Sequence, residues 1–223
     1  MHSLQLTTPS TEVFVRWLAT ADDTTLDQCS LPREWFERDT ITIARELIGA
    51  ILVRRSETGA LQAARLVETE AYLPHDPASH SWRGKTPRNR AMFERGGCVY
   101  VYRIYGIHRC VNVVTEQKGV GAAVLLRAGE PLLGLEEFTM QRGRPIEAAR
   151  LLSGPANLAR CFRFDLDDNG RPCCGDGIWI LPAVELPPYV EVSPRIGISR
   201  AQDAMLRFFD PTSLAVSARR NAS

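Results

Sequence analysis

The chain has 223 residues, an apolar fraction of 44% and a formal net charge of +1. This length suits one large domain or two small ones and can bury a core without disulfides or a structural metal. No segment approaches the roughly 20 consecutive apolar residues of a membrane span, and the N-terminus lacks the basic and apolar regions of a signal peptide. We therefore expect a cytoplasmic protein that does not bind membranes and keeps its six cysteines reduced.

The first third of the chain predicts an extension, a helix and a hairpin. Residues 1–30 have few periodic apolar positions, and we interpret them as a loosely structured extension. Asp39 or Thr40 can then cap a helix that Gly49 ends. Residues 50–72 contain the runs ILVRR and LQAARLVETEAY around the turn SETG, and they predict a β-hairpin.

A long loop and a meander are predicted next. Residues 73–97 are rich in Pro, Gly, His and Arg and lack strand periodicity, so they predict a loop with one helical turn at residues 87–93. Loops of this length in compact domains are usually functional or disordered. The runs CVYVYRI, HRCVNVVT and AAVLLRA then predict an antiparallel meander over residues 98–128, whose first two strands meet at Tyr105.

The last part of the chain predicts two helices and several short strands. We expect helices over residues 130–140 and 153–162, the second with Pro155 in its first turn. Strands are predicted at residues 177–181, 189–193, 195–198 and 206–209. Because strands outnumber helices and run in hairpins, we predict one α+β domain over residues 31–223, with a curved, mainly antiparallel sheet flanked by helices and long loops.

Basic residues concentrate between residues 83 and 109, where seven Lys or Arg stand against one acid, Glu94. Almost all of them are arginines, which make bidentate contacts to phosphate and stack on bases. We therefore predict contacts to a nucleic-acid backbone from Arg88, Arg90 and Arg109. A solvated charged face is the alternative explanation of this pattern.

The run LVETEAY is the densest group of chemically useful residues. Residues two apart in a strand share a face, so Glu68, Glu70 and Tyr72 are expected to point the same way. A carboxylate beside an aromatic ring at a strand end is suited to act as a general base, because an apolar neighbour raises its pKa. The alternative is an edge strand with a solvated acidic face.

Two further groups of residues could form part of a site or have an ordinary structural role. His75, Asp76 and His80 invite a metal site, but their spacing matches no standard ligand pattern, so we expect neither a metal nor a cofactor. The second group lies in the meander, where Tyr100 and Tyr102 are two positions apart and are expected on the same face of one strand.

The meander also offers two residues for contact with bases. Tyr105 lies at a hairpin tip bordered by arginines, an arrangement that suits stacking against bases. Asn112 lies within an apolar strand, where its amide needs partners. It makes either a structural hydrogen bond or a contact that reads a base.

Together these segments resemble the alkyladenine (3-methyladenine) DNA glycosylase family, whose members have a compact single domain. The resemblance covers roughly residues 30 to 210. The matching segments are VETEAY at 67–72, a histidine–serine pair at 80–81, TPRNRAMF at 86–93, GCVYVYRIYGIHRCVNVV at 97–114, AVLLRAGEPLLGLE at 123–136, SGPANLARCF at 153–162 and RIGI at 195–198.

The resemblance implies a set of catalytic residues. Glu70 matches the general base that activates the attacking water. Arg127 and the main chain of Ile196 match groups that help to hold that water. No metal and no lysine nucleophile are implied, so the expected enzyme is monofunctional and has no lyase activity.

The resemblance also implies a pocket for a flipped base. Tyr72, His80 and Tyr102 match the residues that sandwich the base. Tyr105 matches the wedge that fills the vacated stack, and Asn112 matches a residue that disfavours the 2-amino group of guanine. The stacking rings suit a positively charged alkylated purine, which is attracted to aromatic faces.

The function implied is base excision repair of double-stranded DNA by a monomer, in the cytoplasm or at the nucleoid if the source is bacterial. The expected substrates are 3-methyladenine, 7-methylguanine, hypoxanthine and ethenoadenine, and the product is an abasic site. The chain departs from the family at Asn157, where a lysine is frequent, and at residues 107–109. Two alternatives remain: a nucleoside or carbohydrate hydrolase that pairs Glu68 with Glu70, and a non-catalytic nucleic-acid-binding or sugar-binding module.

Overall fold

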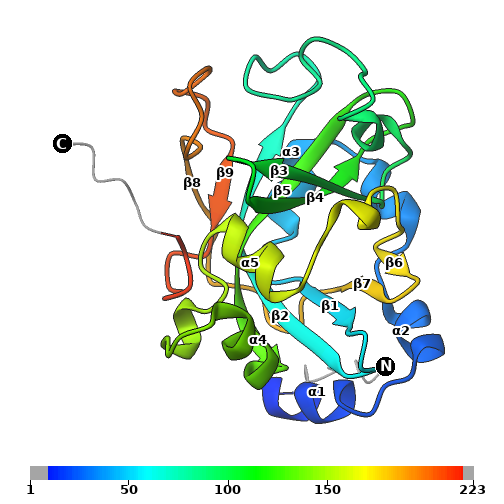
Figure 1. Cartoon of the computed structure of the whole chain (residues 1–223), viewed down its shortest axis with the longest axis vertical. Helices are drawn as coiled ribbons and strands as arrows, with labels where there is room; N and C mark the ends of the chain where they lie inside the picture. The colour runs from blue at the N-terminus through cyan, green and yellow to red at the C-terminus, as the bar shows by residue number, and fades with distance from the viewer. Residues whose placement is uncertain (1–9, 218–223) are drawn as a thin grey trace, which may run out of the picture.

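The computed structural model describes residues 10–217 and shows a curved antiparallel sheet with helices around it (Figure 1). The strands are β1 Ile51–Arg55, β2 Leu61–Tyr72, β3 Val99–Ile104, β4 His108–Thr115, β5 Ala122–Leu133, β6 Cys174–Gly175, β7 Ile178–Leu181, β8 Glu191–Ser193 and β9 Arg207–Phe209. Their order is β3-β4-β5-β2-β1-β7-β6, and the pair β8-β9 joins the second half of β2 through β9. The predicted α+β class is therefore confirmed.

Helices are short. The α-helices are α1 Thr11–Leu18, α2 Asp23–Cys29, α3 Thr40–Glu46, α4 Leu135–Arg142 and α5 Pro155–Cys161, and the 3-10 helices are η1 Arg33–Glu37, η2 Arg90–Phe93, η3 Ala148–Arg150 and η4 Leu166–Asp168. Of these, α1, α2, η1 and α3 precede the first strand, and the others lie between strands in the chain. As predicted, Asp39 caps α3, because its carboxylate accepts the N–H of Thr42 at 2.8 Å. Pro155 occupies the first turn of α5, also as predicted.

Two helices occupy the region that the sequence predicts to be loose. Leu18 of α1 and Leu26 of α2 have no exposed surface and belong to one cluster with Ile51 and Trp179 of the sheet. The prediction of a loosely structured extension is wrong for residues 10–30. Each helix fully buries only one residue, and Phe14 and Trp17 of α1 also pack against this cluster on the same side of the helix as Leu18. Residues 1–9 lie outside the described part of the chain.

Two later elements also differ from the prediction. The expected helix over residues 130–140 is a strand as far as Leu133, because this part of β5 pairs with β2, and α4 begins only after Gly134 turns the chain at a φ of 85°. The expected strand at residues 195–198 is a loop. The backbone N–H of Ile196 donates to the carboxylate of Glu70 instead of to a neighbouring strand, and the side chain of Arg195 donates to the carbonyl of Ala71.

The main core holds the long loop and the meander in place. It includes residues of α3, α4 and α5 and of the central strands, with Phe36, Phe138 and Phe208 among its largest buried side chains. The loop between β2 and β3 is long, as predicted, and η2 packs its Ala91 and Met92 in a cluster with β3, β4 and β5. This loop covers one end of the sheet, opposite α1 and α2 (Figure 1).

Candidate active site

A cavity of about 640 Å³ opens between the long loop, the β3–β4 hairpin and the loop that follows β8. Almost all of the predicted catalytic and base-binding residues line it, namely Tyr72, His80, Tyr102, Tyr105, Asn112, Arg127 and Ile196. These residues come from β2, β3, β4 and β5, from the β3–β4 turn and from two longer loops. The fold therefore brings together side chains that the sequence separates by more than a hundred positions.

Glu70 lies buried directly behind the wall of this cavity. Its Oε1 accepts the backbone N–H of Ile196 at 2.7 Å and lies 3.2 Å from Nη1 of Arg127. Its Oε2 accepts the hydroxyl of Tyr72 at 2.9 Å. Burial and the neighbouring Glu70 both raise the pKa of Tyr72, so Tyr72 stays protonated as the donor. A carboxylate has about four acceptor sites, and three donors surround Glu70 here, so one site remains for a further hydrogen bond.

Glu68 is also buried, but its partners differ from those of Glu70. It accepts hydrogen bonds from Nε of Arg127 at 2.8 Å, from Nε of Arg207 at 2.7 Å and from the backbone N–H of Ser217 at 2.7 Å. Burial raises its pKa, but the two arginines and Ser217 outweigh burial and lower the pKa below its ordinary value. Glu68 is therefore an ionised anchor for Arg127.

The strand of the two glutamates is not at a solvated edge. Neither Glu68 nor Glu70 has exposed surface, so the interpretation as a solvated acidic face is wrong. Sequence reasoning missed Arg207 and Ser217, which reach Glu68 from the last part of the chain. Arg207 is next to Glu70 in the register of β2 with β9, but that pairing could not be read from the sequence.

Aromatic rings form one wall of the cavity. Tyr100 and Tyr102 stack with ring centroids 5.6 Å apart, as expected from their alternation on β3. His80 meets Tyr102 edge to face at 4.5 Å, and its Nδ1 lies 2.9 Å from the hydroxyl of Tyr100. The sequence prediction assigned Tyr100 no role in the pocket, although the period of the strand places it on the same face as Tyr102.

His80 is expected to make binding of cationic bases sensitive to pH. Partial burial and the charge of Arg88 lower its pKa, so the ring is neutral at pH 7. Protonation below that pKa places a second positive charge against a cationic base. We expect the affinity for 7-methylguanine DNA to fall as the pH drops below 6.5, the ordinary value from which the pKa of His80 is lowered, while affinity for neutral hypoxanthine changes less. Binding titrations with both duplexes measure this, and parallel pH curves would contradict it.

Asn112 is buried in the cavity wall, whereas Tyr105 is exposed at the tip of the β3–β4 hairpin. Asn112 is 3% exposed, and its Nδ2 donates to the carbonyl of Tyr100 at 3.0 Å, so the amide is held rigidly in the cavity wall. Tyr105 is 88% exposed at the hairpin tip. Tyr105 and Gly106 have φ angles of 49° and 73°, the two positive values of a tight hairpin turn. The side chain of Tyr105 therefore projects from a well-defined turn.

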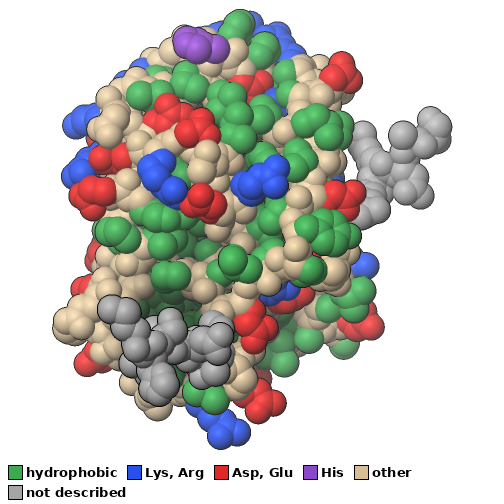
Figure 2. All heavy atoms as spheres, turned by 180° about the vertical axis from the view of Figure 1, so that it is seen from behind, with side chains coloured by type: hydrophobic (Ala, Val, Ile, Leu, Met, Phe, Trp, Pro, Cys, Tyr) green, Lys and Arg blue, Asp and Glu red, His purple; other side chains and the backbone are tan. Residues whose placement is uncertain are grey.

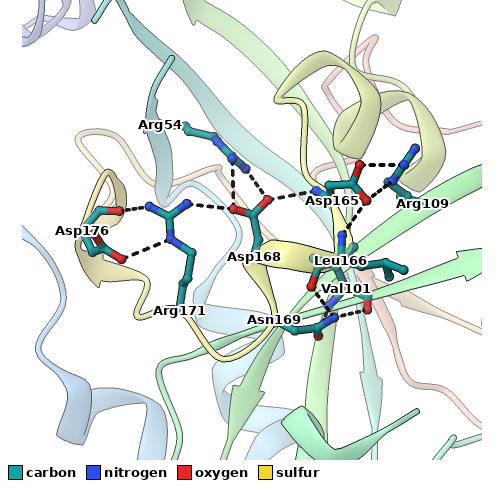
Figure 3. A network of polar contacts seen from close by, with 9 residues as sticks. All are labelled: Arg54, Val101, Arg109, Asp165, Leu166, Asp168, Asn169, Arg171 and Asp176. Carbon is teal, nitrogen blue, oxygen red and sulfur yellow. Dashed lines mark hydrogen bonds and ion pairs between the residues drawn. The ribbon is translucent and has the colours of Figure 1, made fainter. Parts of the chain in front are cut away.

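The three predicted backbone-contacting arginines have different positions. Arg88 lines the cavity, and its Nη2 donates to the carbonyl of Arg103 at 3.1 Å. Arg90 is exposed on η2. Arg109 forms an ion pair with Asp165 at 2.6 Å and lines a separate cavity beside α5 (Figure 3). The structure therefore does not bring Arg109 to the same cavity as Arg88.

Outside the cavity, the described residues bear on the other predictions made from the sequence. On the face opposite the view of Figure 1, basic and acidic side chains are interspersed (Figure 2). Asp76, suggested by sequence as a metal ligand, instead binds Arg195. Within residues 10–217, no three His, Cys, Asp or Glu side chains are grouped to hold a metal ion. In the same residues, no helix is long and apolar enough to cross a membrane.

Comparison with known proteins agrees with this arrangement. The profile of the methylpurine-DNA glycosylase family matches residues 34–213. The chain belongs to this family. Its members excise methylated purines from DNA, so the protein is a DNA repair glycosylase that acts on alkylated purines and a hydrolase of N-glycosyl bonds.

Curated relatives are similar over most of this methylpurine-DNA glycosylase. A protein of Methanoculleus marisnigri is 45% identical over 195 residues, which cover 85% of this chain and 100% of the relative. One from Chlorobaculum parvum is 43% identical, with 85% and 91% covered, and one from Corynebacterium glutamicum is 44% identical, with 80% and 92% covered. All three are named as candidate 3-methyladenine DNA glycosylases.

Proposed function

We propose that Glu70 is the general base that activates water for hydrolysis of the N-glycosidic bond. The observation that carries this proposal is the position of its carboxylate, which Ile196, Tyr72 and Arg127 hold at the cavity wall. Arg127 and Ile196 line the cavity and both contact Glu70, so we place the attacking water beside them. The proposed step needs one carboxylate and one water and no metal.

The cavity is proposed to bind a purine that has left the DNA stack. Extruding a base costs a few kcal/mol and is easiest for damaged, weakly paired bases. Tyr72, His80 and Tyr102 offer ring faces and edges to such a base, and a cationic alkylated purine gains cation–π attraction from the tyrosines. We propose 3-methyladenine, 7-methylguanine, hypoxanthine and ethenoadenine in double-stranded DNA as substrates of a monomeric enzyme.

Tyr105 is proposed to fill the gap that the flipped base leaves. Replacing Tyr105 by serine is expected to reduce excision from duplex DNA about tenfold, since loss of about 1.4 kcal/mol of support for the flipped state is a factor of ten. Single-turnover excision and the fluorescence of a base analogue beside the lesion measure the effect. The control is Tyr189→Ser, because Tyr189 is also exposed but does not line the cavity. Equal behaviour of both variants would show that Tyr105 has no such role.

Asn112 is proposed to exclude normal guanine. Its amide is held by a hydrogen bond to the carbonyl of Tyr100, so it cannot rotate away from the 2-amino group of guanine, and the two groups clash. Such overpacking costs about 1–3 kcal/mol, which corresponds to about a tenfold or larger discrimination. We expect Asn112→Ser to raise guanine excision relative to hypoxanthine excision about tenfold. An unchanged ratio in single-turnover assays would make Asn112 a purely structural residue.

The lesion range is tested with duplex oligonucleotides that each carry one lesion, followed by alkaline cleavage of abasic sites. We expect cleavage only after alkali, because the proposed chemistry has no lyase step. Strand cleavage before alkali would contradict this. We expect the enzyme to act where DNA lies, in the cytoplasm and at the nucleoid of a bacterial cell. The alternative of a paired acid and base gains no support from Glu68, because burial is outweighed by two arginines and the backbone N–H of Ser217, which bind its carboxylate and lower its pKa, and this does not suit an acid.

A further inference from the structure

Arg195 is a buried cation next to the proposed base pocket. Its side chain has no exposed surface, and the centre of its guanidinium lies 4.6 Å from the centroid of the Tyr72 ring. Arg195 itself does not line the cavity, whereas Tyr72 does. The guanidinium therefore covers one face of Tyr72, and the ring meets the cavity with its other face or its edge.

One guanidinium also ties three segments of the chain together. Nη1 of Arg195 donates to the carbonyl of Ala71 at 2.9 Å, directly before Tyr72 in β2. Nη1 and Nη2 both bind the carboxylate of Asp76 in the long loop, the latter at 3.0 Å. The next residue after Arg195 is Ile196, whose N–H binds Glu70. Movement of Arg195 would therefore disturb the ring of Tyr72 and the carboxylate of Glu70 together.

Its hydrogen bonding is incomplete. Among the described residues, Nε of Arg195 is a buried side-chain nitrogen without a hydrogen-bond partner. Buried polar groups are ordinarily satisfied, so each exception calls for an explanation. Here the planar guanidinium lies over the ring of Tyr72, and its two terminal nitrogens bind Asp76 and Ala71. This orientation leaves Nε without a hydrogen-bond partner among residues 10–217.

We propose that Arg195 is a positioning residue for excision, which orients the ring of Tyr72 and keeps the N–H of Ile196 on Glu70. The inference rests on the proposed function, because it takes Tyr72 as a base-stacking ring. Arg195 acts through these neighbours and does not touch the substrate. Displacements of about 1 Å at reacting groups can lower rates about 100-fold, so loss of this support is expected to affect the chemical step.

A second arginine in the same chain provides a matched control. Arg54 lies 4.5 Å from the centroid of Phe164 and binds the carboxylate of Asp168 with both terminal nitrogens, at 2.9 and 3.0 Å (Figure 3). It repeats the combination of aromatic ring, guanidinium and buried aspartate. Neither Arg54 nor Phe164 lines the base cavity. Removing Arg54 should therefore cost stability without changing excision by the folded enzyme.

The test compares Arg195→Met with Arg54→Met at a temperature where near-ultraviolet circular dichroism shows both to be folded. Single-turnover excision with saturating enzyme is measured, together with the emission of ethenoadenine in the bound duplex. We expect Arg195→Met to lose about tenfold or more in rate and to alter the emission, and Arg54→Met to stay within about twofold of the wild type. Arg195→Lys should recover only part of the rate, because lysine has no planar fork.

Equal losses in Arg195→Met and Arg54→Met would overturn the inference. If Arg195→Met does not fold, Asp76→Asn is tested instead, because the amide keeps the shape of the carboxylate but binds the guanidinium of Arg195 more weakly. An unchanged excision rate in Asp76→Asn would also overturn the inference. Tyr72→Leu separates this failure from failure of the proposed function. If Tyr72→Leu leaves the emission of bound ethenoadenine unchanged, Tyr72 does not stack on the base, and the proposed pocket fails along with the inference.

Discussion

Replacing Glu70 by glutamine is expected to slow base release at least about 100-fold while binding of damaged DNA survives. The amide has nearly the shape of the carboxylate, but it cannot take a proton from water. Arg127 keeps its ion pair with Glu68, so the fold is retained. Single-turnover release of hypoxanthine and gel-shift affinity for the same duplex measure the two effects separately.

Glu130 provides the control for this substitution. It is another glutamate paired with an arginine, but its partners Arg65 and Ser213 do not line the cavity, whereas all three partners of Glu70 do. Glu130→Gln should keep the wild-type rate. Turnover by Glu70→Gln that is comparable to Glu130→Gln would remove Glu70 from the role of general base.

Glu68→Gln is expected to act on stability. Glu68 has no exposed surface and compensates the charges of Arg127 and Arg207. Breaking a buried ion pair by removing one partner costs about 3–5 kcal/mol, because the other charge is left uncompensated. Urea unfolding should show this loss in the free energy of unfolding. A loss below about 1 kcal/mol would mean that solvent reaches the cluster.

The same carboxylate predicts how stability depends on pH. The pKa of Glu68 is lowered in the folded protein relative to its ordinary value of 4.5, so its contribution is fully present above that value. It is lost as the pH falls through the lower pKa of the folded state. Urea midpoints of the wild type should therefore fall below about pH 4.5 more steeply than those of Glu68→Gln. Parallel curves would contradict the assignment.

Local patterns in the sequence were enough to predict several parts of the site. The alternation in LVETEAY placed Glu70 and Tyr72 on one face, and the run around Tyr105 predicted the hairpin tip. Both depend on residues a few positions apart. Resemblance to a family added Arg127 and Ile196, which lie in the cavity wall but which no local pattern connects to Glu70.

What the sequence did not predict depends on contacts between distant segments. Arg207 reaches Glu68 across 139 positions, and Asp165 neutralises Arg109 across 56 positions. The segment at residues 195–198 has the composition of a strand but forms a loop, in which the backbone N–H of Ile196 donates to Glu70 and the side chain of Arg195 donates to Ala71. The periodicity of a sequence gives no information about such side-chain partners, and this is why the strand predicted at residues 195–198 was wrong.

The most direct test of the central claim is to measure the products from methylated duplex DNA. The wild-type protein should release free methylated purines in a one-to-one ratio with abasic sites, in strands that remain uncut. Borohydride should trap no covalent complex between enzyme and DNA, because water is the nucleophile. Absence of free base, or a borohydride-trapped complex with cut strands, would contradict hydrolysis by a water that Glu70 activates.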